Sequence, residues 1–134
     1  MTKTILVVDD EPVIIELLQV NLNLEGYDVI TAANGREALE KAAENTPDLI
    51  ILDIMMPKMD GWTARAELLK DPATAGVPVI FLTARAQQAD LKRGQESKVA
   101  AYITKPFEPA ELLSIIRQIF DGTYKPEDHP PANW

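Results

Sequence analysis

The sequence contains no cysteine in its 134 residues. This absence excludes disulfide bonds, zinc sites built from thiolates and catalysis by a thiol. It suits a reducing compartment, and we expect the protein in the cytoplasm. Histidine is scarce too. The single copy, His129, lies close to the C-terminus. Chemistry elsewhere in the chain must therefore rely on other side chains.

Positive charge is also in short supply, with 13 Lys and Arg against 21 Asp and Glu and a net charge of −8. A domain with this charge repels phosphate backbones, so we expect no direct binding to nucleic acid. Long hydrophobic runs are missing as well. The first apolar run is interrupted at Asp9, too early for a signal peptide, and no segment could span a bilayer. We therefore expect no contact with a membrane.

What the sequence does contain is typical of one globular domain. Hydrophobic residues make up 46% of the chain and charged residues 25%, and the length is sufficient to bury a core. Short apolar runs predict buried strands at residues 5–8, 27–32, 49–52, 77–82 and 100–104. They alternate with segments that predict helices, and this alternation indicates a parallel sheet covered on both faces, an α/β fold.

The predicted helices have recognisable ends. Pro12 and Pro109 suit the first turns of the first and last helices, which Gly26 and Gly122 close. Asn34 predicts the cap of the second helix, with Glu37 three residues on. A third helix is predicted from Trp62 to about residue 70, and a weakly periodic fourth over residues 85–99.

Polar side chains stand at the ends of four predicted strands. Asp9 and Asp10 follow the first strand, Asp53 the third, Thr83 the fourth and Lys105 the fifth. Because the carboxyl ends of parallel strands meet at one edge of a sheet, we expect these side chains to converge there. A helix cap, a β-forming residue or a surface charge explains each of them singly, but explains their joint occurrence poorly.

Such a cluster favours a cation. Three neighbouring carboxylates raise one another's pKa, and Lys105 relieves only part of that repulsion. Oxygen ligands are the kind that Mg²⁺ prefers. We therefore predict a magnesium site beside a free carboxylate, an arrangement suited to phosphoryl transfer onto Asp53 as the nucleophile. Lys105 and Thr83 would stabilise the charge on the phosphoryl oxygens.

Four segments resemble the receiver (CheY-like) domain of two-component response regulators, in the family's order and spacing. They are Val7–Glu11, Leu52–Gly61, Phe81–Arg85 and Tyr102–Phe107. The resemblance covers roughly residues 3–120. It implies a single doubly wound (βα)5 domain, flavodoxin-like, with the parallel strand order 2-1-3-4-5.

The resemblance also implies a role for each acid. Asp53 would be the phospho-acceptor. Asp10 and Asp53 would ligate Mg²⁺ directly, together with the backbone carbonyl of Met55. Asp9 would act mainly through a bound water.

On the opposite side of the phosphoryl group the resemblance implies a contact from Lys105, with a cis bond between Lys105 and Pro106. Thr83 and Tyr102 would form a switch pair, in which Thr83 moves toward the phosphoryl group and Tyr102 turns inward behind it. The changed surface would comprise residues 85–99, the fifth strand and the last helix. This sequence departs from the family before Tyr102, where Lys98–Ala101 replaces a frequent Gly-Ala-acid stretch, so we do not carry over the usual dimer contacts of that face.

The resemblance implies a signalling phospho-acceptor rather than an enzyme, although it would assist its own magnesium-dependent phosphoryl transfer and dephosphorylation. The phosphodonor would be a sensor histidine kinase or a histidine phosphotransfer protein, and the output would be a downstream protein target. We expect a monomer or a weak phosphorylation-dependent homodimer. We place the receiver domain at residues 1–121 and a tail at 122–134, with no output domain.

Three alternatives are open. A haloacid-dehalogenase-type phosphatase needs a second acid two residues after its nucleophile, where this chain has Met55. A flavodoxin-type electron carrier needs a Ser/Thr-rich phosphate loop after the first strand, where three acids stand instead. A pseudo-receiver would be a phosphorylation-independent protein-binding module. It would keep the fold and lose acids that this chain retains.

Overall fold

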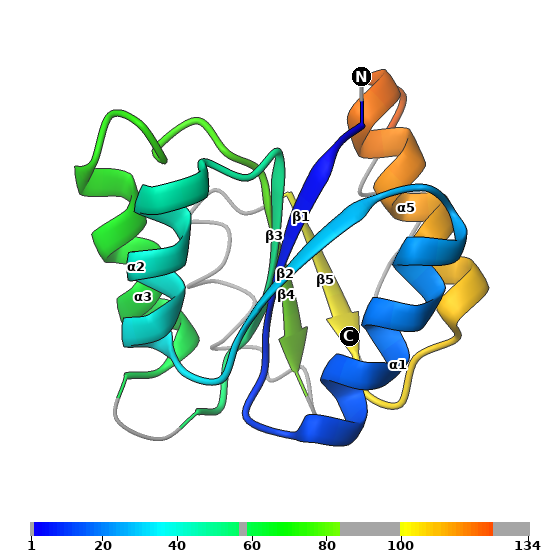
Figure 1. The fold of residues 1–134 in the computed structure, drawn as a ribbon, viewed down its shortest axis with the longest axis horizontal. Helices are drawn as coiled ribbons and strands as arrows, with labels where there is room; N and C mark the ends of the chain where they lie inside the picture. Colours follow the sequence, from blue (N-terminus) through cyan, green and yellow to red (C-terminus); the bar gives the residue numbers. More distant parts are fainter. Residues whose placement is uncertain (1, 57–58, 84–99, 125–134) are drawn as a thin grey trace.

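The computed structural model describes residues 2–56, 59–83 and 100–124, and the statements below concern those ranges. Strands and helices alternate along the described chain, except that the last two strands follow one another among the described elements (Figure 1). The elements are β1 (Thr4–Val8), α1 (Pro12–Leu24), β2 (Asp28–Ala32), α2 (Gly35–Asn45), β3 (Leu49–Asp53), α3 (Gly61–Lys70), β4 (Val79–Thr83), β5 (Ala101–Thr104) and α5 (Pro109–Asp121). The predicted helix over residues 85–99 lies outside the described residues, so no element here is called α4.

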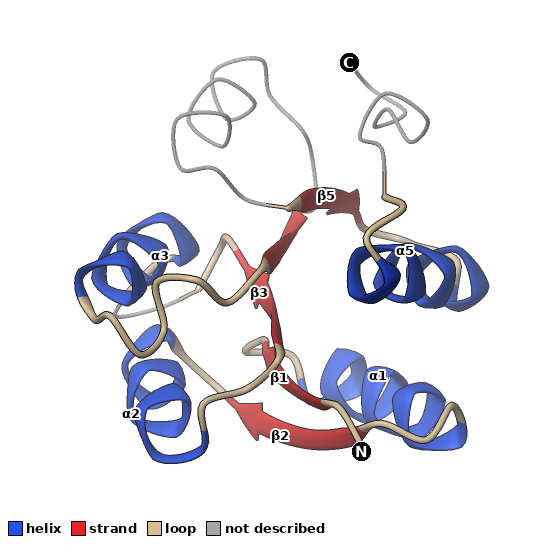
Figure 2. Ribbon diagram, turned by 90° about the horizontal axis from the view of Figure 1, so that it is seen from above, coloured by secondary structure: helices blue, strands red, loops and turns tan. Residues whose placement is uncertain are grey.

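The five strands form one parallel sheet in the order β2-β1-β3-β4-β5, which confirms the predicted fold and strand order. Seen along the sheet, α2 and α3 cover one face, and α1 and α5 cover the other (Figure 2). The strand order reverses at β1, so the chain leaves β1 and β3 toward opposite faces. In such sheets the crevice at the carboxyl ends of these two strands is where ligands bind.

Strand register brings the predicted site residues to that crevice. Val8 of β1 pairs with Leu52 of β3, and Asp53 pairs with Leu82 of β4. The residues that follow Val8 and Leu82 therefore stand on either side of Asp53. The convergence predicted from the sequence is a direct result of this register.

Two apolar clusters, one on each face, hold the sheet. Every residue of β3 and β4 is buried, as the unbroken apolar runs predict for strands covered on both sides. Phe81 and Leu52 belong to the cluster under α2 and α3, and Ile51 and Leu112 to the cluster under α1 and α5. A fully buried side chain of this size contributes about 1.5–3 kcal/mol of transfer free energy, so the two clusters anchor the strands that carry the site.

The helix ends follow the sequence signals closely. The Asn34 side chain caps α2 by accepting from the backbone N–H of Glu37, and Gly122 ends α5 with φ of 80°. The capping box differs in one bond, because the Glu37 carboxylate accepts at 3.4 Å from Ala33 rather than from the cap residue. Asp60 caps α3, which therefore begins at Gly61, one residue before the predicted start.

Near the end of the described chain, α5 stops at the predicted domain boundary, Asp121. The two residues after Gly122 fold back onto the end of α5, because the N–H groups of Thr123 and Tyr124 both donate to the carbonyl of Gln118. Tyr124 is partly buried against the α1–α5 cluster. Residues 125–134 lie outside the described ranges, and the proposed division at residue 121 stays a prediction. Among the described helices, none has the length and apolarity that a membrane crossing requires.

Candidate functional site

Asp53 ends β3 with its side chain almost fully buried, at 3% relative exposure. Its Oδ1 atom accepts a hydrogen bond of 3.1 Å from the backbone N–H of Met55. The backbone turns sharply after Ile54, whose carbonyl accepts from the N–H of Gly61 at 2.9 Å. Asp53 is therefore held from its own strand and from the loop that follows it.

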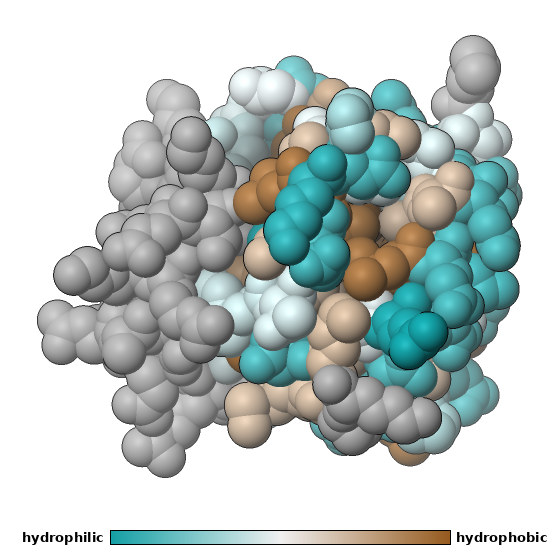
Figure 3. Space-filling model, turned by 90° about the vertical axis from the view of Figure 1, so that its left-hand side faces the viewer, coloured by the Kyte–Doolittle hydropathy of each residue, from teal (hydrophilic) through white to brown (hydrophobic). Residues whose placement is uncertain are grey.

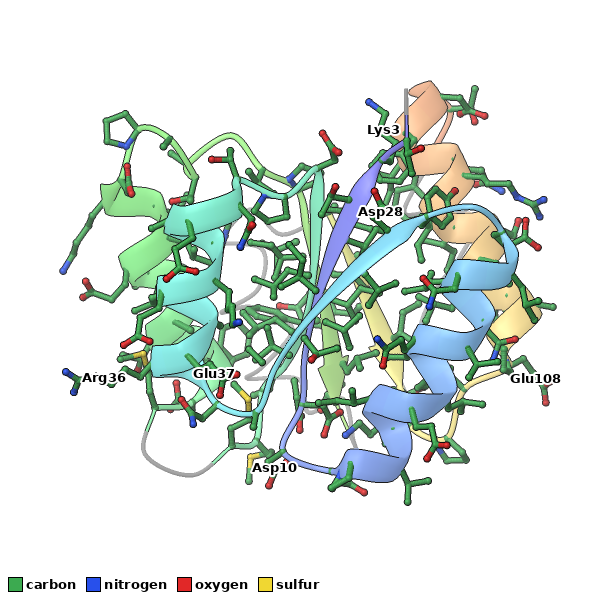
Figure 4. All side chains as sticks on the ribbon, viewed as in Figure 1. Lys3, Asp10, Asp28, Arg36, Glu37 and Glu108 are labelled. Atoms are coloured by element: carbon green, nitrogen blue, oxygen red, sulfur yellow. The ribbon has the colours of Figure 1, made fainter. Side chains whose placement is uncertain are left out.

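The end of β1 supplies the neighbouring acids. Asp9 is fully buried, and its Oδ1 atom accepts from the backbone N–H of Glu11 at 2.9 Å. Asp10 is exposed and lies at the carboxyl end of β1, whereas Lys3 and Asp28 lie at the opposite end of the sheet (Figure 4). The buried and the exposed carboxylate thus reach the same edge from consecutive positions.

Lys105 follows β5 and reaches across the sheet edge to three carboxylates. Its Nζ atom lies 2.8 Å from Oδ2 of Asp9, 3.1 Å from Oε1 of Glu11 and 3.4 Å from Oδ2 of Asp53. The bond that follows it, to Pro106, is cis, as expected. The ammonium is therefore the shared counter-ion of acids from two strands and the start of α1.

Burial and like charge perturb the titration of this cluster. Desolvation, followed by the charge of Asp9, raises the pKa of Asp53 from 3.8 to about 6, against the opposing effect of Lys105. Burial alone would lower the pKa of Lys105, but the contact with Asp9 and the charge of Asp53 outweigh it and raise that pKa. The ionised form of Asp53 is thus electrostatically unfavourable, and an additional cation would stabilise it.

The site has the features of a divalent cation site. Asp9, Asp10, Glu11 and Asp53 each offer a carboxylate oxygen, and these atoms lie within 4.8 Å of one another. Oδ2 of Asp9 is buried, and it pairs with the ammonium of Lys105 at 2.8 Å. Four carboxylates beside a single ammonium form an all-oxygen set with excess negative charge, and the residues present therefore fit Mg²⁺, the expected ion.

Thr83 and Tyr102, the expected switch pair, come from neighbouring strands. Thr83 ends β4 and is buried, and its carbonyl accepts from the N–H of Lys105 at 2.7 Å. Tyr102 is partly buried in β5, and its ring packs 5.6 Å from that of Phe81 and 6.4 Å from that of Trp62. Thr83 therefore adjoins the acidic edge, while Tyr102 belongs to an aromatic cluster on the α3 face.

Three residues of this region were missing from the sequence-based site. Glu11 directly precedes the predicted helix start at Pro12, and no sequence signal indicates its contact with Lys105. Gly61 ends the second of the four matching segments and is not among the expected site residues, although a Cβ there would lie 2.6 Å from the backbone oxygen of Asp53. Trp62 packs against Phe81 with ring centroids 4.8 Å apart, a contact that depends on tertiary structure.

The face formed by α2 and α3 presents mixed hydrophilic and hydrophobic side chains (Figure 3). A pocket of about 200 Å³ lies on this side, lined by Leu39, Glu67, Leu68, Asp71 and Thr74. Its lining residues from α3 lie at the end of that helix remote from Gly61. The pocket is therefore separate from the acidic edge.

Comparison with known proteins agrees with this geometry. Residues 5–117 match the family described as the response regulator receiver domain. The chain belongs to this family. The receiver domain is a signalling domain of two-component systems. In this chain, both the sequence and the structure place acids and a lysine together at one edge of the sheet.

Individual relatives resemble this chain over most of the chain's own length. The alkaline phosphatase synthesis transcriptional regulatory protein PhoP of Bacillus subtilis is 46% identical over 119 residues, which are 89% of this chain and 49% of that protein. The chain thus spans about half the length of this relative. The structure of chemotaxis protein CheY4 from Vibrio cholerae has 31% identity and a TM-score of 0.85, covering 89% of this chain and 99% of that one.

A third relative bears on the metal. The receiver domain of the sensor histidine kinase PA1611 from Pseudomonas aeruginosa is 34% identical with a TM-score of 0.81, covering 91% of this chain and 99% of that one. That structure has a magnesium ion coordinated in its active site cleft. Within the present chain, the acidic cluster can hold a metal ion of this kind.

Proposed function

We propose that this receiver accepts a phosphoryl group on Asp53 from a histidine kinase or a histidine phosphotransfer protein, and that the acylphosphate changes the surface it offers to a downstream protein. The observation that carries the proposal is the position of the Asp53 carboxylate. It is buried at a strand end, 3.4 Å from Lys105 and clustered with three further acids.

Each residue has a chemical task in this proposal. Asp53 is the nucleophile, and no general base is needed because its carboxylate is ionised near neutral pH. Mg²⁺ would be held by Asp10, Asp53 and the backbone carbonyl of Met55, and Asp9 would act through a water. Bound Mg²⁺ neutralises charge on the transferring phosphoryl group.

Lys105 and Thr83 complete the site from the other side. The ammonium of Lys105 pairs with a phosphoryl oxygen, and the Thr83 hydroxyl donates to another, so that charge developing in the transition state is stabilised. As Thr83 moves toward the phosphoryl group, Tyr102 turns inward toward the space it leaves. The two side chains thereby couple phosphorylation to the surface around β5 and α5. The same groups support hydrolysis of the acylphosphate, so the receiver assists its own dephosphorylation.

The phosphodonor is expected to dock on α1. The outer face of this helix carries Val13, Leu17, Val20 and Leu24, with relative exposures of 73%, 38%, 53% and 80%. Their spacing of four, three and four residues places them in one stripe along the helix. The stripe begins two residues after Glu11, so a partner helix packed along it would lie next to the Asp53 edge.

Beyond the phosphodonor, the partner is a protein whose binding depends on the phosphorylated surface. We propose no direct contact with nucleic acid, because the net charge of −8 opposes it. The receiver would act as a monomer or a weak phosphorylation-dependent homodimer. We place it in the cytoplasm, where ATP-dependent kinases and Mg²⁺ are present.

The test is labelling with a small phosphodonor. With acetyl phosphate and Mg²⁺, the wild type should gain one phosphoryl group that is stable in acid and labile in base, detected by mass spectrometry of the intact protein. Asp53→Asn, which keeps the shape of the side chain, should gain none. Equal labelling of both proteins would remove Asp53 from the role, and no labelling of either would favour the pseudo-receiver alternative.

A further inference from the structure

Glu11 immediately precedes α1, and its side chain turns away from the helix to contact Lys105. Oε1 of Glu11 accepts a hydrogen bond of 3.1 Å from Nζ of Lys105. The Glu11 side chain is 60% exposed, whereas that of Lys105 is only 13% exposed. The contact therefore joins a solvated carboxylate to an ammonium that lies inside the site.

Helix capping does not account for this carboxylate. Glu11 is the N-cap residue of α1, but among the described residues its side chain makes no capping hydrogen bond. Asn34 and Asp60, the N-caps of α2 and α3, each accept from a backbone N–H of their own helix. The Glu11 side chain is thus directed to Lys105 instead of to the start of its helix.

The ammonium of Lys105 has three protons and already faces three carboxylates. A phosphoryl group on Asp53 removes that carboxylate charge and brings anionic phosphoryl oxygens to Lys105, so Asp9 and Glu11 are the carboxylates that then compete with the phosphoryl group for the ammonium. Asp9 is buried, so separating it from the ammonium would leave a charge away from water. Glu11 is exposed, so its carboxylate regains water when the contact opens.

We propose that Glu11 is the counter-ion that Lys105 releases when Asp53 accepts a phosphoryl group. This inference rests on the proposed function. Glu11 acts through Lys105 and through its charge, so it is a positioning residue. In the resting protein it holds the ammonium and adds a negative charge to the metal site, and during transfer the same charge repels the incoming phosphoryl oxygens.

The charge of Glu11 should strengthen Mg²⁺ binding but slow phosphorylation. A general loss of structure would weaken both, so the opposite signs distinguish the two explanations. Removing the charge at residue 11 should weaken Mg²⁺ binding, because one of four clustered acids is lost. At saturating Mg²⁺ it should also accelerate phosphorylation by a small anionic donor, because the competitor for Lys105 is gone. A unit charge about 5 Å from a doubly charged group in a water-like medium changes either quantity by about tenfold.

The experiment compares wild type with Glu11→Gln, which keeps the length of the side chain and loses its charge. Mg²⁺ affinity is measured by titration without a phosphodonor, and the labelling rate is measured with acetyl phosphate at saturating Mg²⁺. We expect an affinity about tenfold weaker and a rate about tenfold faster. Glu16→Gln is the control, because Glu16 is an exposed acid of the same helix about 7 Å further along its axis. It should change both quantities less than twofold. Glu11→Asp keeps the charge and should return most of the Mg²⁺ affinity.

A thermodynamic cycle tests the resting contact without metal or donor. Glu11→Gln, Lys105→Met and the double variant are unfolded in urea with EDTA present. A midpoint shift for Glu11→Gln that is smaller in the Lys105→Met background supports the contact, and equal shifts in both backgrounds overturn it. A Mg²⁺ affinity and a rate like those of wild type in Glu11→Gln would also overturn the proposal. Failure of the wild type to be labelled would count against the proposed function, and the titration and the cycle would still decide the role of Glu11 in the resting site.

Discussion

Gly61 and Asp53 are in backbone contact: a Cβ atom on Gly61 would lie 2.6 Å from the carbonyl oxygen of Asp53 and 2.8 Å from Cα of Ile54. Both obstructing groups are backbone atoms at the end of a fully buried strand, so neither can move aside cheaply. The N–H of Gly61 also donates to the carbonyl of Ile54. The start of α3 is therefore fitted directly against the strand end that carries the candidate nucleophile.

Gly61→Ala should consequently displace the loop and reduce both stability and phosphorylation. Overpacking of this kind destabilises a protein by about 1–3 kcal/mol, which urea unfolding would measure. Gly76→Ala is the matched control, because a Cβ at Gly76 meets nothing within 4 Å. An alanine at residue 61 that behaved like the one at residue 76 would show that the close approach has no energetic importance.

Asp53→Asn should stabilise the metal-free protein near neutral pH. The pKa of Asp53 is raised from 3.8 to about 6, so the folded state holds the proton more tightly than the unfolded state. Ionisation therefore opposes folding: the penalty is absent below about pH 4, grows between about pH 4 and 6, and reaches about 3 kcal/mol above that range. Asparagine avoids this penalty. The measurement is the difference in unfolding free energy between variant and wild type, with EDTA, across that pH range. A difference that stayed constant with pH would contradict the raised pKa.

Asp10→Asn should abolish most of the stabilisation that Mg²⁺ gives. A ligand at a hundred times its dissociation constant stabilises the folded state by about 2.7 kcal/mol, so thermal unfolding with and without Mg²⁺ reports binding. Because Asp10 is exposed, its replacement should change the metal-free protein little. Asp28→Asn removes the same charge from an exposed residue at the far end of the sheet (Figure 4) and should keep the full Mg²⁺ response. If both variants respond to Mg²⁺ as the wild type does, the proposed metal site is wrong.

Thr83→Ala should separate phosphorylation from its conformational consequence. Labelling should still proceed, because Asp53, Lys105 and the acids are unchanged, but the loss of the Thr83 hydrogen bond should slow it by about tenfold at most. The loss of one hydrogen bond to a charged group should reduce the equilibrium population of the switched state by about tenfold. Amide chemical shifts near Tyr102, recorded with and without acetyl phosphate, would measure it. Thr63→Ala, at an exposed position of α3, should leave those shifts as in wild type.

A charge in the apolar stripe of α1 should block the protein phosphodonor but not the small one. Val20→Glu places a carboxylate in the middle of the stripe, and the loss of a central interface residue of this kind weakens binding by about tenfold or more. Transfer from phosphorylated histidine phosphotransfer domains should fall accordingly, while labelling by acetyl phosphate continues. Leu69→Glu alters an exposed apolar residue on α3 and is the control. Equal transfer to all three proteins would rule out docking on α1.

Much of this molecule could be derived from local sequence signals. The unbroken apolar runs predicted β3 and β4 as doubly covered strands because burial on both faces requires apolar residues at every position. The caps Asn34 and Gly122 were predictable because they satisfy backbone groups of their own helices. The acids and the lysine at strand ends were identifiable because parallel strands share one edge, whatever their order.

The tertiary structure decided what depends on distance between separate segments. Lys105 pairs with Glu11 across 94 positions of sequence, and no local pattern records that contact. Gly61 lies against Asp53, with its N–H bonded to the carbonyl of Ile54, and the shift in the pKa of Asp53 arises from burial and from Asp9, which only packing brings near. The sequence alone therefore determined that Asp9, Asp10, Asp53, Thr83 and Lys105 gather at the sheet edge, while packing added Glu11 and set the contacts that each group makes there.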